Sequence, residues 1–249
     1  LKNFENVVKQ CDLEIDNLIY TPYAIGLSLL SEEEKELGVA LVDIGSTLSS
    51  LSIFYNGTIL FTKIIPLGGN MITNDISRIF SLSIVDSERI KIINGQLIEE
   101  LENSLSIIEV DALGNDNDSV EIMRKDLIAV IKPRVNEIIN SLKEHILESG
   151  YNHLIANRVV ITGGASQMDG VIEITSKIIE KRARLGKSSV IKGIPDNMRS
   201  SSFSAINSLL TYSIINNNDI SVKNNIKSNN SEGLYSYLIK FKNWILENF

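Results

Sequence analysis

Residues 39–53 read Val-Ala-Leu-Val-Asp-Ile-Gly-Ser-Thr-Leu-Ser-Ser-Leu-Ser-Ile, and this stretch decides the fold. An apolar run ends at Asp43, a turn follows at Gly45, and Leu51 and Ile53 then alternate with polar residues. The pattern predicts a buried strand, a tight polar turn and a second strand paired with the first. A carboxylate beside a turn of small residues can hold a phosphate and its metal ion. An ordinary hairpin has the same pattern, so both interpretations remain open.

The composition is that of a globular protein with room for one large domain or two small ones. The chain has 249 residues, of which 43% are hydrophobic and 22% charged. The net charge of −7 and the lack of basic clusters argue against nucleic-acid binding. The single cysteine, Cys11, excludes an internal disulfide framework and is expected in the core at a helix end. No apolar run approaches the roughly 20 residues that span a bilayer.

The segments around the opening stretch predict a three-stranded meander flanked by helices. Helices are expected over residues 1–10 and 22–30, with a short strand at 18–20 between them. Ser31 and Glu34 have the spacing of a capping box. A third strand is expected at 58–66, after a hairpin turn at Asn56-Gly57.

Two further glycine pairs each precede a predicted helix. Gly68 and Gly69 come before apolar residues at helical spacing, and Gly163-Gly164 links a buried strand at 157–161 to a helix at 171–181. Glycines before a helix N-terminus suit an anion, because unpaired N–H groups and the helix dipole favour negative charge. They are also a common way to turn a corner, so neither pair is decisive alone.

The middle of the chain predicts more helix than strand. A helix is expected at 86–93, where Glu88 and Lys91 have the spacing of a surface salt bridge. A strand is expected at 107–110, and one long helix at 119–149 that Pro133 kinks or divides. A short strand at 190–194 and a helix at 202–212 follow.

The end of the chain changes character. Residues 216–231 are dense in Asn, Ser and Lys, which predicts a flexible linker. A helix expected at 234–249 would need no such linker to dock on its own domain. An apolar face with aromatic residues and lysines at its edges suits a lipid surface. Docking on the same domain remains the alternative. The residues expected to contact lipid are Leu234, Tyr237, Leu238, Phe241, Trp244, Ile245 and Phe249.

Three loops occur in an order that resembles that of the actin-like ATPase superfamily. They are Asp43-Ile-Gly45, Gly68-Gly69 and Thr162-Gly163-Gly164. Within this superfamily, Glu36-Leu-Gly-Val39 and Ile65-Pro-Leu-Gly-Gly-Asn70 are most similar to the bacterial cell-division FtsA family. The resemblance covers nearly the whole chain. It implies an α/β, actin-like (ribonuclease H-like) fold with a mixed sheet and flanking helices, plus a C-terminal amphipathic helix on a flexible tether. Since the chain starts in mid-pattern without Met, we expect a C-terminal portion of a longer protein.

The resemblance also implies a division into subdomains. Residues 1–37 would be the returning part of subdomain 1A, 38–71 and 156–215 subdomain 2A, and 72–155 subdomain 2B. The linker would cover 216–233 and the membrane helix 234–249.

The same resemblance implies that ATP lies in a cleft, with Mg²⁺ near Asp43. Glu88 and Lys91 would flank the ribose and base. The remaining nucleotide-binding residues would be Gly45, Ser46, Thr47, Gly68, Gly69, Gly163, Gly164, Ser166 and Gln167. The family's first phosphate loop is absent from this chain. Ser46 and Thr47 stand where the family has glycines, and the added Cβ atoms hinder close approach to phosphate, so weak ATP binding is expected.

The function that the resemblance implies is that of an adaptor in septum assembly. Such a protein forms actin-like filaments, binds FtsZ and other divisome proteins, and attaches as a peripheral protein to the cytoplasmic face of the inner membrane. Arg134 resembles part of the family's FtsZ-binding region. No catalytic residue is predicted, so at most a weak ATPase is expected. Two alternatives are an actin-fold kinase or ATPase acting on a small substrate and an actin-like cytoplasmic subunit of a pilus or secretion assembly.

Overall fold

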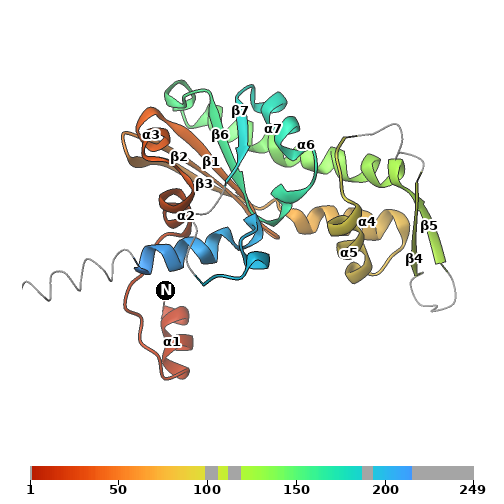
Figure 1. The fold of residues 1–249 in the computed structure, drawn as a ribbon, viewed down its shortest axis with the longest axis horizontal. Helices are drawn as coiled ribbons and strands as arrows, with labels where there is room; N and C mark the ends of the chain where they lie inside the picture. The colour runs from red at the N-terminus through yellow and green to blue at the C-terminus, as the bar shows by residue number, and fades with distance from the viewer. Residues whose placement is uncertain (1, 99–105, 112–118, 187–192, 215–249) are drawn as a thin grey trace, which may run out of the picture. The chain divides into compact units, whose positions relative to one another are not determined.

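The computed structural model describes residues 2–98, 106–111, 119–186 and 193–214 (Figure 1). Residues 1–209 form one compact unit, and a second unit covers 210–249. The predicted linker and lipid-contacting residues at 216–249 lie outside the described residues, as does most of the predicted strand at 190–194.

The first unit is built on a five-stranded mixed sheet with the strand order β3-β2-β1-β6-β7. β1 is antiparallel to β2 and parallel to β6, and Asp43 is opposite Ser50 on one side and Thr162 on the other. The β2–β3 turn contains Asn56 and Gly57, both with positive φ. The predicted meander is therefore confirmed. The strands are β1 (Val39–Ile44), β2 (Ser49–Tyr55), β3 (Thr58–Ile65), β6 (Arg158–Thr162) and β7 (Arg182–Leu185).

Helices cover the sheet and extend from it to a separate hairpin. Figure 1 shows α6 running from the sheet past α4 and α5 toward the strands β4 and β5. The labelled helices are α1 (Lys2–Gln10), α2 (Thr21–Leu29), α3 (Glu32–Leu37), α4 (Gly69–Phe80), α5 (Ile84–Asn94), α6 (Arg124–Glu148) and α7 (Val171–Ile179), and residues 204–214 are also helical. The hairpin consists of β4 (Ile107–Asp111) and β5 (Ser119–Met123).

β1 is buried on both faces of the sheet, which explains its unbroken apolar sequence. Ala40, Val42 and Ile44 belong to the larger core, which also contains residues of α4, α6 and α7. Val39 and Leu41 belong to a smaller core with residues of α2. Successive side chains of a strand face opposite sides, so a strand between two cores needs apolar residues at every position.

Several expected elements differ from those observed. Residues 119–123 form β5 rather than the start of a helix, and Pro133 lies inside the unbroken helix α6. The predicted strand at 18–20 forms no ladder, and the helix expected to reach 181 ends at Ile179 before β7. Cys11 is exposed, because α1 has no buried residue among those described.

Candidate functional site

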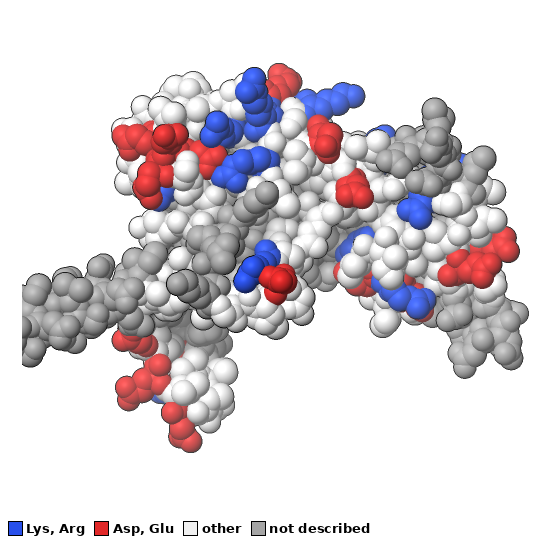
Figure 2. Space-filling view, viewed as in Figure 1, with Lys and Arg blue, Asp and Glu red and all other residues white. Residues whose placement is uncertain are grey.

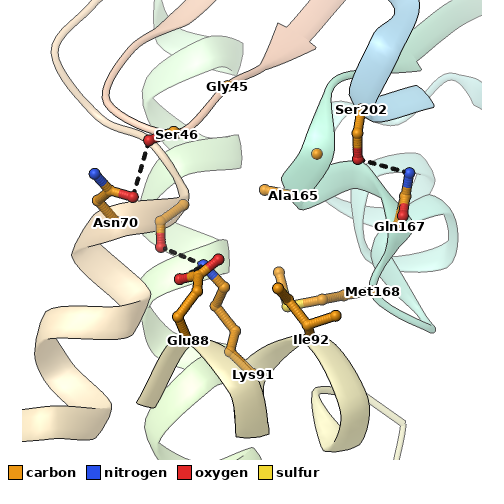
Figure 3. Close-up of a pocket in the computed structure, with 12 residues that line it drawn as sticks. Gly45, Ser46, Asn70, Glu88, Lys91, Ile92, Ala165, Gln167, Met168 and Ser202 are labelled. Atoms are coloured by element: carbon orange, nitrogen blue, oxygen red, sulfur yellow. Dashed lines mark hydrogen bonds and ion pairs between the residues drawn. The ribbon is translucent and has the colours of Figure 1, made fainter. Parts of the chain in front are cut away.

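A cleft of about 310 Å³ opens at the ends of the parallel strands β1 and β6 (Figure 3). Open α/β sheets bind ligands at the carboxyl ends of their strands, so its position is that of a binding site. The turn after β1, the N-terminus of α4 and the helix α5 form one wall, and the short turns η2 (Gly164–Gln167) and η4 (Ser201–Phe203) form the other. Its lining residues are Gly45, Ser46, Gly69, Asn70, Glu88, Lys91, Ile92, Gly164, Ala165, Gln167, Met168 and Ser202.

The turn after β1 is held by the N-terminus of α4. The N–H groups of Gly69 and Asn70 donate to the carbonyl oxygens of Gly45 and Ser46, at 2.9 and 2.7 Å. These helix N–H groups are therefore occupied within the chain. The N–H groups of Ser46, Thr47 and Leu48 have no hydrogen-bond partner among the described residues. Successive free N–H groups in a turn form an anion-binding concavity, so the turn itself is the better candidate for phosphate.

Gly68 lies directly behind this turn. A Cβ atom at Gly68 would come within 2.5 Å of the Ser46 carbonyl oxygen, so only glycine lets α4 approach so closely. Gly68 thus positions the turn without itself lining the cleft.

Asp43 lies at the end of β1 beside the second glycine pair. Its carboxylate has no hydrogen-bond partner among the described residues, and burial raises its pKa. Gly163 has φ +92, and a Cβ atom there would come within 2.5 Å of Asp43 Oδ1. The site therefore requires glycine at 163 for both backbone conformation and space.

A hydrated divalent cation fits these observations, since it would compensate the unpaired, partly buried carboxylate. Among the residues that the structure describes, no three His, Cys, Asp or Glu side chains gather as a metal site. Mg²⁺ typically binds through one or two carboxylates and completes its shell with water and phosphate oxygens. Asp43 is thus suited to Mg²⁺ that arrives with a nucleotide.

Lys91 and Glu88 come together at the cleft wall, but Lys91 is already fully bonded. Its Nζ donates to Glu88 at 2.6 Å and to the Gly69 carbonyl oxygen at 3.2 Å (Figure 3). It also donates to Thr73 Oγ1 at 2.8 Å. Burial would raise the pKa of Glu88, but hydrogen bonds from Lys91 and Thr73 lower it overall. The surface salt bridge suggested by the spacing is thus a half-buried network that joins α4 to α5.

The opposite wall is held by hydroxyl groups. Gln167 Nε2 donates to Ser202 Oγ at 2.9 Å (Figure 3), and Ser166 Oγ donates to the Gly163 carbonyl oxygen at 2.7 Å. Thr162 Oγ1 donates to Ser204 Oγ at 2.6 Å. These bonds fix residues 201–204 against the end of β6 and place Ser202 in the cleft.

The structure brings most of the predicted nucleotide-binding residues to one place. Seven of them line the cleft, while five, Asp43, Thr47, Gly68, Gly163 and Ser166, do not. Sequence reasoning assigned no role to Asn70, Ile92, Ala165, Met168 and Ser202, which also line it. Ile92 had a usable signal, since it lies four residues after Glu88 on the same helix face.

Arg134 lies away from the cleft, on α6. It forms a two-pronged bond with Asp75, at 2.6 and 3.1 Å, and contacts Glu137. The hydrogen bond to Asp75 is the main cause that raises the pKa of Arg134. Its side chain is 22% exposed, so its role as a partner contact stays a prediction. No helix in the described part of the chain is long and apolar enough to cross a membrane.

Comparison with known structures shows the fold. MreB5 of Spiroplasma citri bound to ADP superposes with a TM-score of 0.69 at 17% identity, over 91% of this chain and 66% of that one. A PilM–PilN type IV pilus biogenesis complex gives a TM-score of 0.60 at 18% identity, over 82% of this chain and 55% of that one. The fold is therefore the actin-like α/β fold of MreB.

Comparison with sequences shows the family. The family model described as cell division protein FtsA matches residues 40–208. FtsA of Pseudomonas aeruginosa is 34% identical over 100% of this chain and 60% of its own length. FtsA of Escherichia coli K12 is 32% identical over 85% of this chain and 52% of its own length. This chain thus spans little more than half the length of these relatives, and it belongs to the FtsA family of cell-division proteins.

Proposed function

We propose that this chain tethers FtsZ filaments to the cytoplasmic face of the inner membrane during septum assembly. The observation that carries the proposal is the sequence of residues 216–249, where an Asn- and Ser-rich stretch precedes apolar and aromatic residues at helical spacing. Family membership supports the cell-division role.

The expected membrane affinity is modest for one chain. Fully burying one large apolar side chain contributes roughly 1.5–3 kcal/mol, so partial burial of several gives reversible attachment on the order of several kcal/mol. Chains gathered on a filament would bind cooperatively, because each further attachment is intramolecular. Filament formation and membrane binding would therefore strengthen each other.

Liposome co-sedimentation tests the tether. The full chain should pellet with vesicles, and Phe241→Glu with Trp244→Glu should abolish pelleting. The matched control, Ser236→Glu with Asn243→Glu, adds the same charge at two residues that are not expected to contact lipid and should retain most of the binding. Equal pelleting of all three proteins would refute the assignment of the lipid-contacting face.

We further propose that the cleft binds ATP with Mg²⁺, and binds it weakly. Free N–H groups at residues 46–48 and the unpaired Asp43 support a phosphate and cation end, and Ile92 and Met168 supply an apolar end. Lys91 has no free donor for a ligand, which supports low affinity. Calorimetric titration with Mg-ATP tests this proposal, and tight binding would contradict it.

The subdomain division fits the observed elements. Residues 38–71 and 156–215 contain the sheet, and 72–155 contain most of α4, all of α5 and α6, and the β4–β5 hairpin. We propose these as subdomains 2A and 2B, with residues 1–37 as part of 1A. Arg134 is proposed to contact FtsZ, so Arg134→Ala should reduce recruitment of FtsZ to vesicles without changing pelleting of this chain.

An ATPase is the second candidate function, and the unpaired carboxylate of Asp43 is the observation that favours it. Measured ATP hydrolysis that disappears with Asp43→Asn would support an enzyme. If the chain binds vesicles but does not hydrolyse ATP, the proposed adaptor function is favoured over an ATPase.

A further inference from the structure

A second recess, of about 230 Å³, lies at the opposite end of the sheet from the cleft. It is found where β1, β6 and β7 begin. We call it the basic recess; its walls include Glu33, Glu34, Leu37, Asn157, Arg158 and Arg182.

Two arginines face each other at this recess. Arg158 and Arg182 are register partners on the parallel strands β6 and β7. Like charges directly opposite on neighbouring strands destabilise a sheet. The Arg158 side chain is 57% exposed, and its one ion pair within the described residues is to Glu34 at 3.3 Å. The Arg182 guanidinium has no partner among the residues that the structure describes.

Glu34 cannot neutralise both Arg158 and Arg182, because its carboxylate already forms an ion pair with Arg184. Arg184 donates to both carboxylate oxygens, at 2.9 and 2.6 Å, and the Ser31 N–H donates at 3.0 Å. The Glu34 side chain is only 4% exposed. The buried Glu34 carboxylate thus pairs with Arg184 and Arg158, and Arg182 is left without a paired carboxylate among the described residues.

We propose that the basic recess binds a carboxylate side chain of a protein partner between Arg158 and Arg182. Planar guanidinium groups match the geometry of a carboxylate and form strong charge-assisted bonds with it. Leu37, which is 66% exposed, borders the same recess and would contact an apolar side chain next to the carboxylate. The partner would therefore present an acidic residue beside an apolar one.

The surroundings disfavour a continuous polyanion such as nucleic acid or an anionic membrane. Glu32, Glu33 and Glu36 are exposed on α3, next to the recess. Figure 2 shows acidic side chains over α3 beside basic side chains over the β6–β7 end of the sheet. A single carboxylate can reach the arginines between these acids, whereas an extended anionic surface meets repulsion.

Fluorescence anisotropy with a labelled, otherwise uncharged peptide that carries a single glutamate next to a leucine tests the proposal on the full chain. At low ionic strength the peptide should bind, and the corresponding glutamine peptide should not. Arg158→Gln and Arg182→Gln should each weaken binding about tenfold, as expected for one charge-assisted hydrogen bond. Arg199→Gln is the control, since Arg199 is 46% exposed and lies outside the recess.

A stability measurement separates binding from folding. Arg182→Gln removes a like-charge contact, so its urea midpoint should equal or exceed that of the unmodified chain. Equal peptide affinity for all variants would overturn the proposal. So would stronger competition by inorganic phosphate than by acetate, or arginine-dependent binding to phosphatidylglycerol vesicles in a chain with Phe241→Glu and Trp244→Glu. None of these outcomes depends on whether the tether proposal holds.

Discussion

Glu34→Gln preserves the shape of a buried side chain but removes a negative charge that accepts hydrogen bonds from three groups. The carboxylate accepts hydrogen bonds from Arg184, Arg158 and the Ser31 N–H. Breaking a buried ion pair by removing one partner costs about 3–5 kcal/mol. Arg184 and Arg158 are 37% and 57% exposed and can regain water, so we expect a loss of roughly 2–3 kcal/mol.

Urea unfolding at several pH values measures this loss and its origin. Burial would raise the pKa of Glu34, but hydrogen bonds from Arg184 and Ser31 lower it below the ordinary value of 4.5. A carboxyl whose folded-state pKa is lowered stabilises the fold above its unfolded-state pKa and loses that contribution as the pH falls through the folded-state pKa. The stability difference between the two proteins should therefore be largest near pH 7 and shrink below about pH 4.5. A difference that stays constant down to acid pH would refute an electrostatic origin.

Three other substitutions have expected effects on the free energy of unfolding. Gly163→Ala should cost about 2 kcal/mol or more in urea unfolding, because φ is +92 and a Cβ atom would lie 2.3 Å from the Ile44 carbonyl oxygen; an unchanged midpoint would contradict this. Lys91→Met should cost about 2 kcal/mol by thermal unfolding and raise the pKa of Glu88 measured by NMR, whereas an unshifted Glu88 would mean that Lys91 is not its partner in solution. Pro133→Ala should stabilise the chain by about 1 kcal/mol, since α6 would gain a hydrogen bond to the Ala129 carbonyl oxygen; a loss of stability would show that the proline ring is needed there.

The elements that the sequence predicts well are those whose pattern is local. The alternation after Gly45 and the Asn56-Gly57 turn specify the meander, and the apolar run at 157–161 specifies β6. β7 was missed because it is an edge strand that begins with Arg182 and is only four residues long. β5 was missed because its five residues run directly into α6.

The cleft was predictable in position but not in its bonding. The three loops mark it, since each follows a strand or precedes a helix at the same end of the sheet. The bonds of Lys91 depend on how α4 packs against α5, which no local pattern specifies. Ile92 and Met168 are apolar, and such residues resemble ordinary core residues until the tertiary structure exposes them.

The turn after β1 is held in place mainly by backbone atoms, since the Gly45 and Ser46 carbonyl oxygens accept hydrogen bonds from the first N–H groups of α4. Side chains at 46–48 contribute little to this attachment, although Ser46 also bonds Asn70. Substitutions at these positions can therefore accumulate over evolutionary time with little loss of folding. The proposed nucleotide binding could therefore weaken through changes in this turn while the fold of the chain persists.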